Sequence, residues 1–168
     1  MKNPMPDLEN NMSRTENIPV LAPNLEGRGL RIAIVAGRFN ANIGEGLLGS
    51  CLGELLARGV AESDILVCKV PGALEMPLTL QALAQTKRFD AMVALGAVIR
   101  GDTYHFEIVS NEMASGITQV QLDTGIPVAN GVLTTNTDEQ AEIRMEIKGR
   151  ECAECAIEMA NLLRTIRA

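Results

Sequence analysis

The stretch "AMVALGAVIRGDTYHFEIVSNE", residues 91–112, decides the fold of this chain. Its first nine residues are all apolar, which is typical of a strand buried on both faces of a parallel sheet. The polarity changes abruptly at Arg100, and from Tyr104 onward the sequence predicts a helix. His105, the only histidine in the chain, is therefore expected just beyond the carboxyl end of a buried strand.

The same order of strand and helix is repeated along the chain. Apolar strands are predicted at residues 30–37, 64–70, 89–99 and 126–134. Helices are predicted at 43–59, 73–88 and 104–125, with one or two more over 137–166, the first of which Thr137 or Asp138 could cap. This alternation predicts an α/β fold, a three-layer sandwich in which helices cover both faces of a central four-stranded parallel sheet, as in flavodoxin-like proteins. Residues 18–23 could form a further short strand.

Length and composition limit the classes of function. A chain of 168 residues fits one domain, and 46% hydrophobic but only 2% aromatic residues require an aliphatic core. We expect this domain at residues 18–168, after a polar and disordered N-terminal arm at 1–17. The net charge of −6 disfavours binding to nucleic acids or anionic membranes. Because no stretch resembles a membrane span or a signal peptide, we expect a cytoplasmic protein.

Two patterns that suggest chemistry are better interpreted as packing features. Cys152 and Cys155 form a C-x-x-C pair inside a helical pattern, without the additional ligands of a zinc site, so we favour packing over metal or redox chemistry. The run "GEGLLG" at 44–49 matches a dinucleotide-binding fingerprint, but Gly44 comes seven residues after the predicted strand end at Gly37. We expect these glycines to allow close helix packing, and we expect neither a metal nor a cofactor.

The carboxyl ends of the four predicted strands should meet at one edge of the sheet, where ligands bind in such folds. His105 could transfer protons there near neutral pH, or it could be an ordinary residue of a first helical turn. Phe39 follows a strand by two residues and, if exposed in a loop, could stack on a planar ring. Glu75 could simply begin a helix, or it could accept hydrogen bonds from a polyol or an amine.

Groups suited to an anion are also expected at this edge. The backbone N–H groups of residues 101–103 and the hydroxyl of Thr103 could bind a phosphate, although the same residues could form only a turn. Arg144 and Lys148 are spaced i,i+4 on a helix, where they could clamp an anion or belong to a solvated face. The residues alone predict a site for a planar heterocycle and a phosphorylated partner, with His105 as the proton carrier.

Several blocks of the sequence resemble the 6,7-dimethyl-8-ribityllumazine synthase family, in order and at nearly the expected spacing. The most specific block is the pattern G-x-V-I-R-G-x-T-x-H within residues 96–105. The resemblance runs from about residue 29 to about residue 165. The blocks are "RFN" (38–40), "VPGALEMP" (70–77), "DAMVALGAVIRGDTYHFEIVSNE" (90–112), "PVANGVLT" (127–134), "DEQAEIR" (138–144) and "KG" (148–149).

The resemblance implies a transferase of riboflavin biosynthesis that works without metal or cofactor. It would condense 5-amino-6-(D-ribitylamino)uracil with 3,4-dihydroxy-2-butanone 4-phosphate to 6,7-dimethyl-8-ribityllumazine. It also implies a homo-oligomer built of pentamers with active sites between adjacent subunits, and it makes riboflavin synthase a candidate partner. A non-catalytic lumazine- or flavin-binding protein of the same fold is the alternative, although such a protein would not need a proton carrier.

Residue roles follow from the resemblance position by position. His105 would be the catalytic acid and base for imine formation and phosphate elimination. Asn130, Arg144 and Lys148 would come from the neighbouring subunit. The phosphate would be held by Gly101, Asp102, Thr103 and Arg144. The ring and the ribityl chain would be bound by Phe39, Asn40, Ala73, Leu74, Glu75, Val98, Ile99, Asn130 and Lys148.

Two positions depart from the family pattern. Asn130 stands where many members carry phenylalanine, so a second aromatic wall against the ring is expected to be missing. Only three residues separate Arg144 from Lys148, whereas many relatives have a longer link. The region of the shorter link varies with the assembly state in the family, and we expect pentamers or their small multiples rather than a sixty-subunit shell.

Overall fold

The computed structural model of this chain describes residues 17–168, so the predicted N-terminal arm lies outside the described residues except for its last position. Within the described part, no helix is both long and apolar enough to cross a membrane. The four strands are β1 (Ile32–Gly37), β2 (Ile65–Val70), β3 (Ala91–Ile99) and β4 (Val128–Thr135). The α-helices are α2 (Ala41–Ala57), α3 (Met76–Gln85), α4 (His105–Thr124), α5 (Asp138–Glu142) and α6 (Met145–Arg167).

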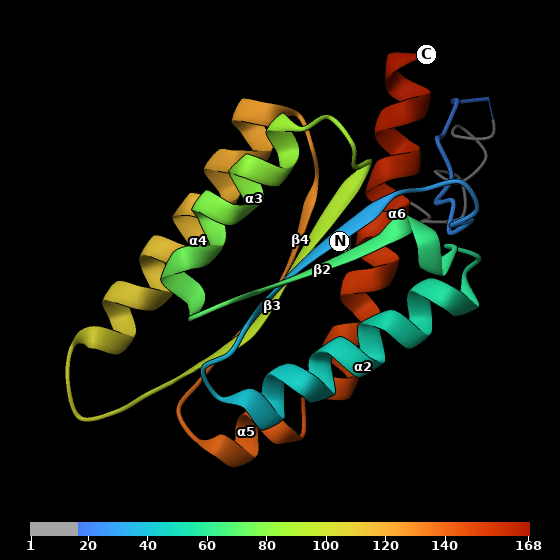
Figure 1. Cartoon of the computed structure of the whole chain (residues 1–168). Coiled ribbons are helices and arrows are strands. Elements are labelled where there is room, and N and C mark those ends of the chain that lie inside the picture. Colours follow the sequence, from blue (N-terminus) through green and yellow to red (C-terminus); the bar gives the residue numbers. More distant parts are fainter. Residues whose placement is uncertain (1–16) are drawn as a thin grey trace, which may run out of the picture.

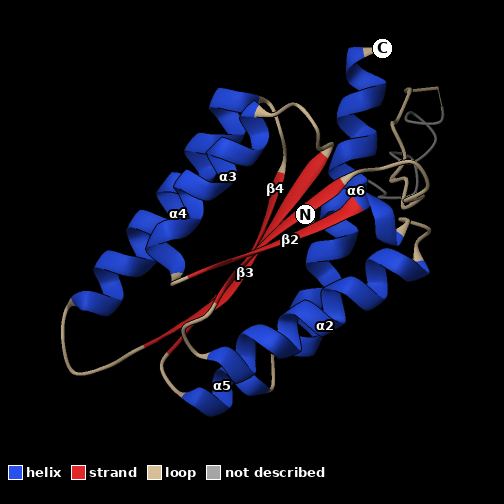
Figure 2. Cartoon of the chain, in the orientation of Figure 1, coloured by secondary structure: helices blue, strands red, loops and turns tan. Residues whose placement is uncertain are grey.

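The strands form one parallel sheet with the order β2-β1-β3-β4. Helices α3 and α4 cover one face of this sheet, and α2, α5 and α6 lie on the other (Figure 1). Coloured by secondary structure, the strands form a twisted central layer between two layers of helices (Figure 2). The predicted three-layer α/β sandwich with a four-stranded parallel sheet is confirmed.

Two aliphatic clusters hold the layers together, one on each face of the sheet. The first joins α2 and α6 to one side of β1, β3 and β4, and the second joins α3 and α4 to the other side. Strands β1 and β3 are buried along nearly their whole length, which explains why their sequences are apolar without alternation. Because all four strands are parallel, their carboxyl ends lie at one edge of the sheet. The residues that follow them there can be polar.

The structure differs from two local predictions and confirms a third. Residues 18–23 do not form a strand, because their backbone joins no sheet; beside them, Asn161 of α6 donates hydrogen bonds to the carbonyl oxygens of Asn24 and Glu26 at 2.9 and 3.0 Å. The helix predicted at 73–88 is divided, since a 3₁₀ turn, η2 (Ala73–Glu75), precedes α3. A cap at the start of α5 is confirmed, because the Thr137 hydroxyl accepts a hydrogen bond from the Gln140 N–H at 3.2 Å.

The two cysteines of the C-x-x-C pair have different surroundings. Cys152 is buried in the cluster between α2, α6 and the sheet, as packing on a helix face predicts, whereas Cys155 is exposed. Burial raises the pKa of the Cys152 thiol to about 11 and that of Cys51, in the same cluster, to about 12. Both thiols are therefore protonated at neutral pH and behave as small apolar groups.

The "GEGLLG" run lies at the beginning and inside of α2 rather than at a strand–helix turn. Gly46 lies against the thioether of Met145 in α6, where a methyl group would overlap the sulfur atom. Gly49 has open space around it, so close packing explains Gly46 but not Gly49. On the α6 side, Gly149 is close to the backbone of α2, since a methyl group there would lie 2.5 Å from the carbonyl oxygen of Leu47.

Candidate active site

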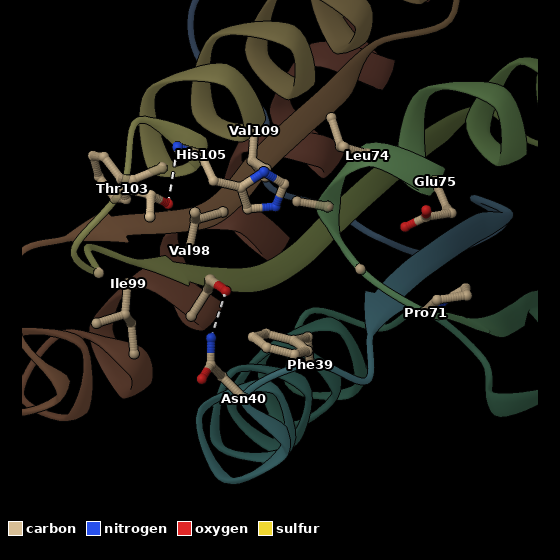
Figure 3. Close-up of a pocket in the computed structure, with 15 residues that line it drawn as sticks. Phe39, Asn40, Pro71, Leu74, Glu75, Val98, Ile99, Thr103, His105 and Val109 are labelled. Carbon is tan, nitrogen blue, oxygen red and sulfur yellow. Dashed lines mark hydrogen bonds between the residues drawn. The ribbon is translucent and has the colours of Figure 1, made fainter.

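A cavity of about 400 Å³ lies at the carboxyl edge of the sheet, between the loop after β1, the turn before α3 and the beginning of α4. Figure 3 shows the His105 ring, the Phe39 ring and the Leu74 side chain around this space, with Val98 at its base. Its lining residues are Phe39, Asn40, Pro71, Gly72, Ala73, Leu74, Glu75, Ala97, Val98, Ile99, Gly101, Thr103, His105, Phe106 and Val109.

The loop after β1 is fixed to two neighbouring strands. The Phe39 N–H donates a hydrogen bond to the Pro71 carbonyl at 3.1 Å, just beyond β2. Asn40 has a left-handed backbone conformation (φ 56°), and its side-chain amide donates to the Ala97 carbonyl of β3 at 2.9 Å (Figure 3). With its backbone held in this way, Phe39 is 74% exposed and its ring lies at the cavity. An exposed aromatic ring on a fixed loop is suited to stacking on a planar ligand.

The η2 turn forms the opposite wall. The Glu75 N–H bonds back to the Gly72 carbonyl at 3.3 Å, which closes the turn. The Thr79 hydroxyl of α3 donates to the Glu75 carbonyl at 2.9 Å, so the wall is joined to the first turn of the helix. Leu74 contributes an apolar side chain to this wall and Glu75 a carboxylate, both exposed.

The first turn of α4 brings the imidazole to the cavity. The Thr103 hydroxyl accepts a hydrogen bond from the His105 N–H at 3.4 Å (Figure 3). Gly101 and Thr103 line the cavity beside His105, whereas Asp102 is not among the lining residues. Unsatisfied N–H groups and the positive end of the helix dipole favour an anion at this position, and Asp102 does not oppose it from inside the cavity.

The structure brings together most of the predicted site, but besides Asp102 three predicted residues lie outside the cavity lining. Asn130 lies on edge strand β4, where its side-chain carbonyl accepts a hydrogen bond from the Val132 N–H at 3.0 Å. Arg144 is exposed between α5 and α6 and donates to the Gln140 carbonyl at 2.8 Å. Lys148 forms an ion pair with Glu151 at 3.4 Å. None of the three lines the cavity of its own chain.

Five lining residues were missed by the sequence analysis. Pro71, Gly72 and Ala97 contribute mainly backbone to the cavity edge, and no side-chain chemistry marks them in the sequence. Phe106 and Val109 do follow from a pattern that was available. Phe106 follows His105 directly, and Val109 comes one turn after it in α4. Helical spacing alone therefore places Val109 on the same side as the imidazole.

The charges around the cavity are few. Glu75 and His105 are the only ionisable side chains among its lining residues in the described part of the chain, and no lysine or arginine is among them. The cavity therefore combines an apolar slot with an aromatic ring, a carboxylate, an imidazole and a helix N-terminus. Such a site can bind a planar, hydroxylated ligand and transfer protons, while a phosphorylated ligand would need a cation from elsewhere.

Known proteins resemble this chain along most of its length. The family model for 6,7-dimethyl-8-ribityllumazine synthase matches residues 29–164. The protein of that name in Nitrosospira multiformis is 60% identical over 155 residues, which are 92% of this chain and 97% of that protein. The one in Laribacter hongkongensis is 63% identical over 144 residues, 84% and 92% of the two chains. The one in Paraburkholderia phytofirmans is 61% identical over 140 residues, 83% of each.

Proposed function

This chain belongs to the 6,7-dimethyl-8-ribityllumazine synthase family, and we propose that the cavity at the carboxyl edge of its sheet is the active site. The activity is that of a transferase in riboflavin biosynthesis. It condenses 5-amino-6-(D-ribitylamino)uracil with 3,4-dihydroxy-2-butanone 4-phosphate to 6,7-dimethyl-8-ribityllumazine, with release of inorganic phosphate and water. One observation carries the assignment of the site: the only histidine, an exposed aromatic ring and a helix N-terminus all face one cavity.

The uracil ring lies against Phe39 in this proposal. The ring of Phe39 is exposed at the cavity, and the apolar side chains of Val98 and Ile99 supply the base of the slot. The ribityl chain extends along the wall formed by residues 73–75, where the Glu75 carboxylate accepts hydrogen bonds from hydroxyl groups. Asn40 takes part through its backbone, since its side-chain amide is already used on Ala97.

The butanone phosphate binds at the beginning of α4. The backbone of Gly101 and the hydroxyl of Thr103 face the cavity there, next to the positive end of the helix dipole. Asp102 contributes its backbone N–H group only, because a carboxylate directed at a phosphate would repel it. This arrangement puts the reacting carbonyl of the butanone within the same cavity as the uracil amine.

His105 moves the protons of the reaction. Imine formation requires that the attacking amine lose protons and that the departing hydroxyl gain one. Elimination of phosphate then requires that a proton be taken from carbon. One imidazole at the mouth of the cavity can do each in turn, because it can be acid and base near neutral pH. The first turn of α4 holds His105 beside residues 101–103, the phosphate loop, so the proton carrier stays close to the leaving group.

A second subunit completes the site in this proposal. The lining residues include no lysine or arginine to balance the phosphate, while Arg144 lies outside its own cavity. Two isoleucines near it in the sequence are exposed: Ile143 is 71% exposed and Ile147 52%. An arginine between exposed isoleucines is suited to a subunit contact that delivers a cation to the neighbour's phosphate. Asn130 and Lys148 are proposed to reach the neighbouring cavity in the same way, within pentamers or their small multiples.

The test is product formation by the purified full-length chain. Mixed with ribitylaminouracil and dihydroxybutanone phosphate, it should form a fluorescent product with the mass of the lumazine and release phosphate, in the presence of a chelator as well as without it. Omission of either substrate is the control. A chain that binds the lumazine but forms none would instead be a non-catalytic binding protein. The cytoplasmic location and a contact with riboflavin synthase stay predictions.

A further inference from the structure

A close contact joins the helix that follows the cavity wall to the helix that carries His105. Pro77 lies in the first turn of α3 and Gly116 lies three turns into α4. A methyl group on Gly116 would lie 2.6 Å from Cγ and 2.8 Å from Cβ of Pro77, much closer than ordinary van der Waals contact. A proline ring cannot rotate away as a flexible side chain can, so only glycine fits at position 116 without displacing α3.

The residue before Pro77 fixes the same helix against the sheet. Met76 is completely buried, and its terminal methyl lies over one glycine in each of two neighbouring strands. Methyl groups on Gly37 of β1 and Gly96 of β3 would lie 3.1 and 2.9 Å from that atom. The beginning of α3 is thus held in two directions, against the sheet through Met76 and against α4 through Pro77.

These contacts act directly on the cavity wall. Residues 73–75 precede Met76 and Pro77 without an intervening residue, and the Thr79 hydroxyl ties the Glu75 carbonyl to the same helical turn. Val109 of α4 faces the cavity from the other side, two turns before Gly116. The separation of Pro77 from Gly116 therefore sets the width of the cavity between the wall and α4.

We propose that Gly116 and Pro77 are positioning residues, whose close contact sets the cavity width that the ribityl-bearing substrate requires. This inference rests on the proposed function, because it identifies the wall at 73–75 with the ribityl subsite. A shift of the order of 1 Å can reduce the efficiency of an enzyme about a hundredfold. The phosphate loop at 101–103 precedes α4 and is not connected to the wall at 73–75, so binding of the butanone phosphate should depend much less on this contact.

The experiment compares Gly116→Ala with a matched exchange elsewhere. Gly116→Ala should raise the dissociation constant of ribitylaminouracil about tenfold and leave the KM of the butanone phosphate within about threefold. Gly49→Ala is the control, since it is also a glycine-to-alanine exchange inside a helix but has open space around it. It should leave both constants unchanged. Unchanged uracil affinity in folded Gly116→Ala overturns the proposal.

Rescue separates positioning from a general loss of structure. Pro77→Gly removes both atoms that the new methyl would approach, so the double variant Gly116→Ala, Pro77→Gly should recover most of the uracil affinity. A double variant as weak as Gly116→Ala contradicts the proposal. If Gly116→Ala does not fold, the single variant Pro77→Gly is the test. It should change the uracil affinity by a larger factor than the KM of the butanone phosphate. Changes of equal size in the two constants overturn the proposal. Wild-type chain without synthase activity would instead refute the proposed function, and is measured first.

Discussion

The guanidinium carbon of Arg100 lies 4.2 Å from the centre of the Phe106 ring. Arg100 stands between the end of β3 and the phosphate loop at 101–103. The same guanidinium donates hydrogen bonds to the Asn136 side chain, at 2.8 Å, and to the Glu107 carboxylate. Arg100 thereby ties the ends of β3 and β4 to the first turn of α4, on both sides of the loop at 101–103. Its charge is balanced by Glu107, whose pKa it lowers, and Arg100 does not line the cavity.

The first prediction concerns Arg100→Lys. Lysine keeps the charge but cannot bond to two partners with a planar group while stacking on Phe106. Loss of about 1 kcal/mol of stacking and hydrogen bonding should loosen the phosphate loop and raise the KM of the butanone phosphate roughly fivefold, with little change in uracil affinity. Steady-state kinetics with each substrate varied gives both values.

A matched control exists at the other end of β3. Arg88 stacks on Phe89, 5.5 Å from its ring centre, and neither residue lines the cavity. Arg88→Lys should therefore leave both kinetic constants unchanged. Equal effects of the two exchanges, or a larger effect on uracil affinity in Arg100→Lys, would mean that Arg100 supports the fold generally and not the loop.

The second prediction concerns the proton carrier. His105→Ala should lower kcat by about 10- to 1,000-fold, within or just below the roughly 100- to 10,000-fold that general acid–base catalysis typically contributes. The dissociation constant of ribitylaminouracil should stay nearly the same, since the ring is held by Phe39 and the strand ends. Rates are measured by product absorbance and affinity by titration of the uracil alone. A variant with the wild-type rate would exclude His105 from the mechanism.

The order of elements and the edge at which the site lies could be predicted because burial on both faces leaves a long apolar signature. Strand β3 ends directly before Arg100 and helix α4 begins at His105, within one residue of the predicted helix start at Tyr104. Residues 18–23 gave a false strand, because a short apolar run does not specify a partner to pair with. The Pro77–Gly116 contact could not be predicted, since it depends on how two helices pack across 39 positions of sequence.

The third prediction concerns the ring platform. Phe39→Ala should weaken the binding of ribitylaminouracil by about 1–3 kcal/mol, as for a base stacked on an aromatic side chain. The KM of the butanone phosphate should change less, and stability should hardly change because the ring is mostly exposed. Calorimetric titration with the uracil and thermal unfolding provide the two readings. Equal weakening of both substrates would indicate that Phe39 maintains the loop instead of contacting the ring.

The fourth prediction is a pH dependence that originates from Cys51. Burial raises the pKa of this thiol from 9.0 to about 12, so the unfolded chain releases the proton first as pH rises. The stabilisation due to the buried neutral thiol is complete below pH 9 and decreases as pH rises from 9 toward 12. Between pH 8 and pH 10, the advantage of wild type over Cys51→Ala in free energy of unfolding should decrease by about 1 kcal/mol.

A buried residue without a titratable group is the control for this measurement. Leu55 is fully buried in the same helix, one turn after Cys51. Leu55→Ala should destabilise by about 2–5 kcal/mol, and by the same amount at both pH values. Urea unfolding at pH 8 and pH 10 gives all the values. A pH-independent difference between wild type and Cys51→Ala would show that the thiol does not titrate differently in the folded and unfolded chain.

The last prediction tests whether two subunits share each site. The cavity of one chain has Phe39 and His105 but no lysine or arginine among its lining residues, and Arg144 is exposed outside it. If Arg144 serves the neighbour, Phe39→Ala and Arg144→Ala impair different halves of one site.

Dissociated and reassembled together, the two variants should form rings in which some interfaces carry both defects and others carry neither. Activity should partly return in the mixture, to a level that depends on the mixing ratio, while each variant reassembled alone stays impaired. Size-exclusion chromatography verifies that the assemblies match the wild type. If mixed rings form and their activity is only the average of the two variants, the site lies within one chain, and the phosphate must be held without Arg144 of a neighbour.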